Sequence, residues 1–533
     1  MLNLFSQRYQ YAPVAQLDRV RGYEPRGREF ESLRARHKNK VVRSPHKKLR
    51  CPKLRRLSQI NTLSAGQRRV FVEKWLQNAL DYNESWLEFQ MRQTKQPGCV
   101  FAVAYKGRVV FEKAYGSSDI NSGERLTPRH RFRVASHSKT FTAAAILKLR
   151  ELGKLNLDDP VGRYIDGLHR DVAKVTLSQL LSHGGGLVRD GADASQWTEK
   201  RPFANKSKLL ADLANGLVIP ANTRMKYSNH GFGLLGLVIE EVTGDSFSSW
   251  VSNNIVTPSN LKETVPDAPI DDSIPKASGH SAELPLGYRV TIAGDNITNA
   301  LAPATGFVST ASDLVTFFSS LDPAARRSVL TKESRRAMQH KQWKDPHGRG
   351  PSDTYYGLGM IMGGTGSWKW AGHAGLFPSA ISFTYMLPGR DICFSILTNA
   401  LDSPVMFWVN GVLNIFKVFG SNPLPNSRTR LWKGRWWEMY QPQPLDLIPF
   451  GNQVFMASPS QLDPFAGTEK ITVTTRNAGF ISQAGGLSNY GEGAHLVLSK
   501  DSKVREVWLG GNCLVSEQKL KTELKRKYER QVK

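Results

Sequence analysis

The chain has 533 residues, of which 40% are hydrophobic, and its formal net charge is +26. A single hydrophobic core stops growing near roughly 250 to 300 residues, so this length predicts two folded domains. No window holds the roughly 18 uninterrupted apolar residues of a membrane span. The 4 cysteines lie too far apart to indicate a zinc site or a disulfide framework.

The basic excess is concentrated at the N-terminus. Residues 1–60 hold 16 Lys and Arg against 4 Asp and Glu. Such a run is typical of a nucleic-acid-binding arm, but residues 11–37 resemble the conceptual translation of a tRNA gene: the permitted codons for residues 12–14 and 34–37 can pair as an acceptor stem. We therefore expect residues 1–60 to be a non-native or disordered segment with the true start downstream, and no nucleic-acid partner. No secretory h-region is visible in it, which predicts a cytoplasmic protein.

Structured sequence is expected from about residue 61. Apolar residues recur at helical spacing from Ser64, a potential N-cap, to Leu80. Two β-prone runs, residues 98–105 and 108–114, are joined by a glycine-containing turn and predict a hairpin. Residues 140–152 are rich in Ala and Leu and precede a glycine, which predicts a helix with a glycine C-cap.

Later segments predict further helices and a second hairpin. The predicted elements are a helix at 231–242, strands at 379–387 and 392–397, a buried helix at 404–420, and a charged helix at 517–533. A Pro- and Asn-containing break at 421–426 separates an expected domain at 61–420 from a small β-rich domain at 427–533. The fold class is α/β (α+β): an antiparallel sheet with a helical subdomain, followed by the β-rich domain.

Ser136 and Lys139 form a Ser-x-x-Lys pattern at the start of the helix predicted at 140–152. A spacing of three residues places both side chains on one helix face, so the amine can approach the hydroxyl. Burial lowers the pKa of a lysine, which lets the amine act as a general base. The helix N-terminus adds a positive dipole end where an oxyanion would develop. Taken alone, the pattern also fits an N-cap serine followed by a surface lysine.

Two more groups carry polar side chains at the ends of predicted elements. Tyr227 and Asn229 precede a glycine-rich helix, and could supply a phenol that relays a proton and an amide that orients a substrate. His373 and Gly375 stand immediately before a predicted edge strand, where a backbone N–H can face a substrate carbonyl. Each group alone also fits a structural role.

Taken together and in this order, the three motifs resemble those of the serine hydrolase superfamily of class C β-lactamases, DD-peptidases and D-aminopeptidases, similar to peptidase family S12. Connecting segments that look like this family are residues 132–136, 157–161, 176–183, 227–236 and 306–310. The resemblance covers roughly residues 65–418 and implies a β-lactamase/transpeptidase-like fold. Residues 427–533 look like the small β-rich domains that some members carry. For Trp432, Trp436 and Trp437 in this region we expect packing between the two domains rather than ligand binding.

The resemblance implies a role for each matched residue. Ser136 would form the acyl-enzyme, and Lys139 and Tyr227 would share the proton transfers. Asn229 would hold the acyl-side amide of the substrate. The backbone N–H groups of Ser136 and Leu376 would form the oxyanion hole. No metal or organic cofactor is required.

Departures from the family pattern bear on the substrate. Ala374 and Leu376 stand where relatives have hydroxyl residues that bind a carboxylate, and His373 stands where β-lactamases usually keep a lysine. We therefore expect a small ester, amide or D-residue-containing peptide as the substrate. The alternatives are a β-lactamase or penicillin-binding enzyme and a non-catalytic penicillin-recognising sensor. A glycine run at 184–186 opens the segment 188–202, a possible lid over the site.

Overall fold

A computed structural model describes residues 72–533 apart from 272, 346–352, 440–441, 486–487 and 529–533. The basic segment and the predicted helix start at Ser64 lie outside these described residues. Val70–Lys533 form one compact unit. Within the described part of the chain, no helix combines the length and apolar character needed to cross a membrane.

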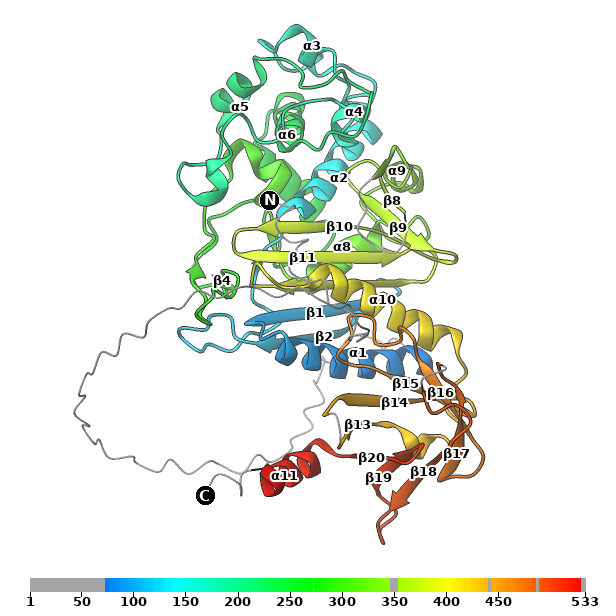
Figure 1. The fold of residues 1–533 in the computed structure, drawn as a ribbon. Helices are drawn as coiled ribbons and strands as arrows, with labels where there is room; N and C mark the ends of the chain where they lie inside the picture. Colours follow the sequence, from blue (N-terminus) through cyan, green and yellow to red (C-terminus); the bar gives the residue numbers. More distant parts are fainter. Residues whose placement is uncertain (1–71, 272, 346–352, 440–441, 486–487, 529–533) are drawn as a thin grey trace, which may run out of the picture. The chain divides into compact units, whose positions relative to one another are not determined.

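An eight-stranded antiparallel sheet forms the centre of the fold (Figure 1). Its strands, in spatial order, are β2 (Arg108–Gly116), β1 (Gly98–Tyr105), β12 (Ile392–Thr398), β11 (Ala380–Leu387), β10 (Trp368–Phe377), β9 (Ile361–Thr365), β8 (Thr354–Tyr356) and β7 (Trp343–Asp345). Both predicted hairpins are confirmed, as β1–β2 and β11–β12. The two hairpins meet where β1 pairs with β12, from Cys99 opposite Thr398 to Tyr105 opposite Ile392.

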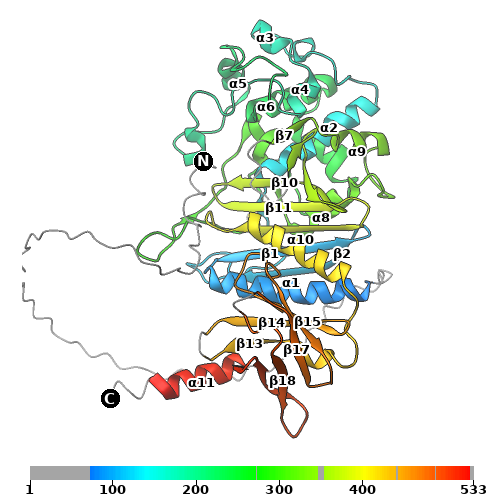
Figure 2. The same ribbon diagram turned by 45° about the vertical axis from the view of Figure 1, so that its right-hand side comes forward.

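Helices cover both faces of this sheet (Figures 1 and 2). The α-helices of the described residues are α1 (Lys74–Gln93), α2 (Ser138–Glu151), α3 (Arg170–Ala173), α4 (Leu177–Leu181), α5 (Lys206–Leu213), α6 (Asn229–Thr243), α7 (Phe247–Val251), α8 (Ala311–Ser320), α9 (Lys332–Met338), α10 (Val405–Ser421) and α11 (Glu517–Tyr528). Of these, α1 and α10 lie on one face of the sheet and α2 and α8 on the other, whereas α11 lies beside the C-terminal barrel. Side chains alternate along β1, so Phe101 and Tyr105 join a cluster with α1 and α10, whereas Ala102 and Ala104 join a cluster with α2, α6 and α8.

The helices predicted at 140–152 and 231–242 are confirmed as α2 and α6. α6 ends at Gly244, which has a φ of +76° and so takes the left-handed conformation that favours glycine. The predicted helix at 404–420 is α10, and the charged C-terminal helix is described as far as Tyr528. Before the C-terminal barrel there are two further short strand pairs, β3 (Phe132–Arg133) with β6 (Val308–Ser309) and β4 (Gly279–His280) with β5 (Thr291–Ile292).

The β-rich C-terminal region is a closed antiparallel barrel. Its strands are β13 (Gly434–Glu438), β14 (Pro444–Phe450), β15 (Gln453–Ala457), β16 (Glu469–Val473), β17 (Ala478–Gln483), β18 (Gly493–Leu498), β19 (Val504–Leu509) and β20 (Asn512–Val515). β13 pairs with both β14 and β20, which closes the barrel.

The barrel packs against α1 and α10. Ile448, Phe450 and Phe455 share one apolar cluster with these helices, and Asn414 Nδ2 donates to Asp463 Oδ1 at 2.6 Å. The barrel therefore lies beyond α1 and α10, on the side of the sheet opposite to α2.

Three tryptophans were expected to pack between the two domains: Trp432, Trp436 and Trp437. This is wrong for Trp432 and Trp436, which lie in the barrel's own core. Only the ring of Trp437 faces α1, 6.3 Å from that of Phe89. Trp436 and Trp437 differ because neighbouring residues of a strand point to opposite faces. Trp432 lies before β13, in the 3₁₀ helix Arg430–Trp432, which packs against β14.

Candidate active site

The turn that carries Ser136 is sharp and tightly held. Ser136 lies in a short 3₁₀ helix, Ala135–His137, directly before α2. Ala135 has a φ of +46°, a conformation that residues with a side chain rarely adopt. Ser138 Oγ donates to the Ala135 carbonyl at 2.5 Å and accepts from the Phe307 N–H at 3.0 Å. These contacts hold the Ser136 hydroxyl at the N-terminus of α2.

Two side chains converge on this hydroxyl. Lys139 Nζ lies 3.1 Å from Ser136 Oγ, and Tyr227 OH lies 2.7 Å from it. Lys139 Nζ also donates to the carbonyl of Ala304 and to Asn229 Oδ1, both at 2.7 Å. The structure thus brings four of the predicted residues, Ser136, Lys139, Tyr227 and Asn229, into one hydrogen-bonded group.

Burial sets the proton affinities of this group. The Lys139 side chain is fully buried, and burial, followed by the charge of Arg189, holds the pKa of Lys139 well below its ordinary value, while Asp190 acts in the opposite direction. Burial also raises the pKa of Tyr227 to about 12. A lysine that readily gives up its proton beside a phenol that keeps its own is suited to accept a proton from Ser136 and relay it.

Asn229 faces Lys139 and a residue that the sequence analysis missed. Its Oδ1 accepts from Lys139 Nζ, and its Nδ2 donates to Asp190 Oδ1 at 2.6 Å. Because an ionised carboxylate only accepts hydrogen bonds, Asp190 fixes which end of the Asn229 amide turns toward Lys139. Asp190 is only 8% exposed. In this structure Asn229 therefore orients Lys139, which goes beyond the substrate contact expected for it.

The segment predicted as a possible lid begins with three residues docked on the start of α6. The carbonyl of Val188 accepts from Ser228 Oγ at 2.6 Å, and the carbonyl of Arg189 accepts from the N–H of Asn229 at 2.9 Å. Asp190 adds the side-chain contact to Asn229. Residues 188–190 therefore form part of the wall of the site.

Further along this segment, Trp197 packs edge-on against Phe203 and Phe377, with ring centroids 5.1 and 5.9 Å apart. Phe377 is the last residue of β10. The second half of the segment therefore reaches the strand that carries the third motif.

That motif lies inside a strand, so the expectation that it precedes an edge strand is wrong. His373, Gly375 and Leu376 belong to β10, which pairs with β11 throughout this stretch and with β9 only from Trp368 to Gly372. The half of β10 that begins at His373 is consequently an edge on the β9 side. An unpaired backbone there can still face a substrate, because β9 stops short.

Gly375 brings β10 against the turn that carries Ser136. A Cβ at Gly375 would lie 2.1 Å from the carbonyl oxygen of Val134, so only glycine permits this approach. The next peptide, which includes the N–H of Leu376, thereby lies next to the turn of Ser136. The Leu376 side chain itself packs into the apolar cluster of α1 and α10.

His373 does not act as a substitute for a lysine cation here. It is 3% exposed, and its Nε2 lies 3.1 Å from Tyr356 OH. Burial holds the pKa of His373 well below its ordinary value, so the imidazole is neutral. The substrate-facing positive charge of the third motif is therefore missing from this position.

His183 and Tyr356 form an aromatic support under Tyr227. The His183 ring lies 4.1 Å from that of Tyr227 and 4.7 Å from that of Tyr356, measured between centroids. His183 Nδ1 accepts from the N–H of Ser228 at 3.2 Å. Sequence analysis matched His183 only as part of a family segment, and no local pattern marked Tyr356.

The described residues contain no cluster of three or more His, Cys, Asp or Glu with the geometry of a metal site.

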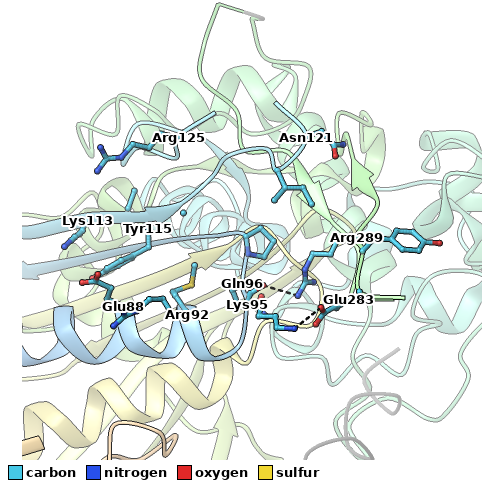
Figure 3. A pocket seen from close by; sticks show the side chains of 17 residues that line it. Glu88, Arg92, Lys95, Gln96, Lys113, Tyr115, Asn121, Arg125, Glu283 and Arg289 are labelled. Carbon is cyan, nitrogen blue, oxygen red and sulfur yellow. Dashed lines mark hydrogen bonds and ion pairs between the residues drawn. The ribbon is translucent and has the colours of Figure 1, made fainter. Parts of the chain in front are cut away.

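A hollow of about 900 Å³ lies elsewhere on the molecule (Figure 3). It is lined by the C-terminal end of α1, by β2 and by residues around 283–289, and an ion pair of 3.6 Å joins Lys95 and Glu283 there. Exposed cations such as Arg92 line it. None of the residues predicted for the site takes part in it.

Similar solved structures share this fold. The octameric penicillin-binding protein homologue from Pyrococcus abyssi is 22% identical, with a TM-score of 0.57 over 82% of this chain and 100% of its own. A D-amino acid amidase from Ochrobactrum anthropi SV3, complexed with L-phenylalanine amide, is 22% identical, with a TM-score of 0.54 over 64% of this chain and 98% of its own. At this level of identity the likeness concerns the fold.

Curated relatives match over shorter stretches. Protein flp of Staphylococcus aureus (strain COL) is 28% identical over 182 residues, which is 33% of this chain and 36% of the relative. Beta-lactamase-like protein 4 of Dictyostelium discoideum is 32% identical over 202 residues, 33% of this chain and 34% of the relative. The chain thus matches about a third of the length of these relatives. Residues 83–408, which include Ser136, Lys139, Tyr227 and His373, match the Beta-lactamase protein family, and the chain belongs to that family.

Proposed function

We propose that this protein is a serine hydrolase that forms an acyl-enzyme at Ser136 with a small ester, an amide or a peptide that contains a D-residue. The observation that carries the proposal is the convergence of Lys139 Nζ and Tyr227 OH on Ser136 Oγ, at 3.1 and 2.7 Å. A nucleophilic hydroxyl needs such an adjacent base. The names of the structural neighbours, among them a D-stereospecific amidohydrolase from a Streptomyces species and the D-amino acid amidase, add support.

In the proposed reaction, Ser136 Oγ attacks the carbonyl carbon as its proton passes to Lys139. The oxyanion accepts hydrogen bonds from the N–H groups of Ser136 and Leu376. Tyr227 and Lys139 then protonate the leaving group as its bond to the carbonyl carbon breaks. A water molecule then attacks the carbonyl carbon of the acyl-enzyme and gives a proton to the same pair. The bond from that carbon to Ser136 Oγ breaks, the carboxylic acid leaves, and Ser136 Oγ takes the proton back.

Efficient β-lactam hydrolysis is the weaker alternative. The carboxylate of a β-lactam needs a cation and hydroxyl donors, whereas this chain offers the buried neutral imidazole of His373 and the apolar Ala374 and Leu376. Each missing hydrogen bond to a buried polar group costs on the order of 1 to 3 kcal/mol.

Turnover tests the proposal. The full chain is incubated with a 4-nitrophenyl ester and, separately, with fluorescent penicillin, with Ser136→Ala as the control. We expect nitrophenol release that stops in the variant. Stable penicillin labelling without turnover would favour the sensor alternative, and rapid loss of the penicillin label would favour the β-lactamase alternative. No label and no release from the folded protein would refute the catalytic assignment.

A further inference from the structure

A half-exposed arginine lies beside the nucleophile. The side chain of Arg189 is 50% exposed, and its guanidinium carbon lies 5.0 Å from the centroid of the Tyr227 ring. The hydroxyl of that ring donates to Ser136 Oγ. Arg189 is therefore close enough to contact a substrate held at Ser136.

Most of the hydrogen-bonding capacity of this guanidinium is unused. Nε of Arg189 donates to Asp190 Oδ2 at 3.0 Å. Among the described residues, neither of its Nη groups has a hydrogen-bond or ion-pair partner. The two Nη groups form the planar fork that binds a carboxylate with two parallel hydrogen bonds.

The charges around Ser136 favour an anion. The cations are Arg189, which lies against the Tyr227 ring, and Lys226, which directly precedes Tyr227, whereas the nearby carboxylate is that of Asp190, which already accepts from Asn229 and Arg189. Burial and the charge of Arg189 lower the pKa of Lys226, a sign that positive charges repel one another here. An anionic group on the substrate would offset this repulsion.

We propose that Arg189 binds a carboxylate on the acyl portion of the substrate and so selects anionic acyl groups. The acyl side follows from the position of Arg189, because its carbonyl accepts from the N–H of Asn229, the residue expected beside the acyl-side amide. His373, buried and bound to Tyr356, supplies no positive charge for this contact, whereas Arg189 is half-exposed. This inference rests on the proposed hydrolase activity.

Matched esters test the inference on the full chain. The substrates are 4-nitrophenyl monoesters of glutaric, adipic and pimelic acid, each paired with the neutral diester in which the free carboxylate is methylated. A further ester has a neutral acyl group and carries the carboxylate on its nitrophenol. The variants are Arg189→Gln, Arg189→Lys and, as the control, Arg92→Gln, which removes an equal charge from the hollow of Figure 3. The readout is the ratio of kcat/KM for each anionic ester to that for its neutral partner.

We expect the wild type to favour at least one anionic acyl ester by about tenfold, the size of one charge-assisted hydrogen bond. The Arg189→Gln variant loses this preference but still hydrolyses the neutral ester. The Arg189→Lys variant keeps part of the preference, and the Arg92→Gln control keeps all of it. A wild type that hydrolyses neutral and anionic acyl esters equally overturns the inference and leaves the hydrolase assignment standing. A preference for the anionic nitrophenol alone overturns the placement on the acyl side. Absence of hydrolysis of every ester refutes the hydrolase assignment and, with it, the inference.

Discussion

Replacement of Asp190 by Asn removes the carboxylate that orients Asn229 while its size is kept. Asp190 is 8% exposed and accepts from Asn229 Nδ2 at 2.6 Å, and Asn229 Oδ1 in turn holds Lys139 Nζ at 2.7 Å. A hydrogen bond to a charged group contributes about 1.5 to 3 kcal/mol. If that amount is lost from the transition state, kcat/KM falls about ten- to a hundredfold.

The same variant has a signature in its pH profile. Asp190 raises the pKa of Lys139, so its removal lowers that pKa further. Because Lys139 acts as a base only after it loses its proton, the acidic limb of kcat/KM moves to lower pH. Arg189→Gln moves the limb the opposite way, because the charge of Arg189 lowers the pKa of Lys139.

The assay is the pH dependence of kcat/KM for a neutral 4-nitrophenyl ester. Asp193→Asn is the matched control, since Asp193 lies on the same segment and contacts Ser195 and Arg201 instead of the site. An unchanged kcat/KM in Asp190→Asn, or a limb displaced to higher pH, would refute the assigned role of Asp190.

Three further changes probe the surroundings of Ser136. Tyr227→Phe keeps the ring but removes the hydroxyl that contacts Ser136, and steady-state kinetics should show kcat lower by about 10² to 10⁴-fold. Gly375→Ala places a Cβ 2.1 Å from the Val134 carbonyl oxygen, so thermal unfolding should show that the free energy of unfolding is lower by about 1 to 3 kcal/mol. The variant should also lose activity. Burial lowers the pKa of His137 from 6.5 to about 3. Between these two pH values the imidazole is protonated in the unfolded chain but not in the folded protein. Urea unfolding should therefore show stability declining below about pH 6.5, and declining less in His137→Phe.

The sequence predicted the elements and residues that local patterns encode. β-Prone runs around tight turns gave both hairpins, and glycines after apolar helices gave the ends of α2 and α6. The Ser-x-x-Lys spacing predicted that Lys139 reaches Ser136, because both lie within one turn at the start of α2. The order of the motifs predicted that Tyr227, 91 residues after Ser136, belongs to the same site.

Contacts between distant segments could not be predicted in this way. Asp190 follows a glycine run without periodicity, and nothing local indicates that its carboxylate meets Asn229. His373 has the same neighbours in sequence whether it is exposed and charged or buried against Tyr356. Trp436 was placed at a domain boundary because closure of the barrel, which buries it, depends on pairing between the first and last barrel strands.

The central claim, that Ser136 is the nucleophile, is tested most directly by mass spectrometry of the protein quenched early in turnover of a 4-nitrophenyl ester. We predict one acyl group on the peptide that contains Ser136, formed and lost at rates consistent with steady-state turnover, and none in Ser136→Ala. An acyl group on another residue, or unchanged turnover by Ser136→Ala, would contradict the account.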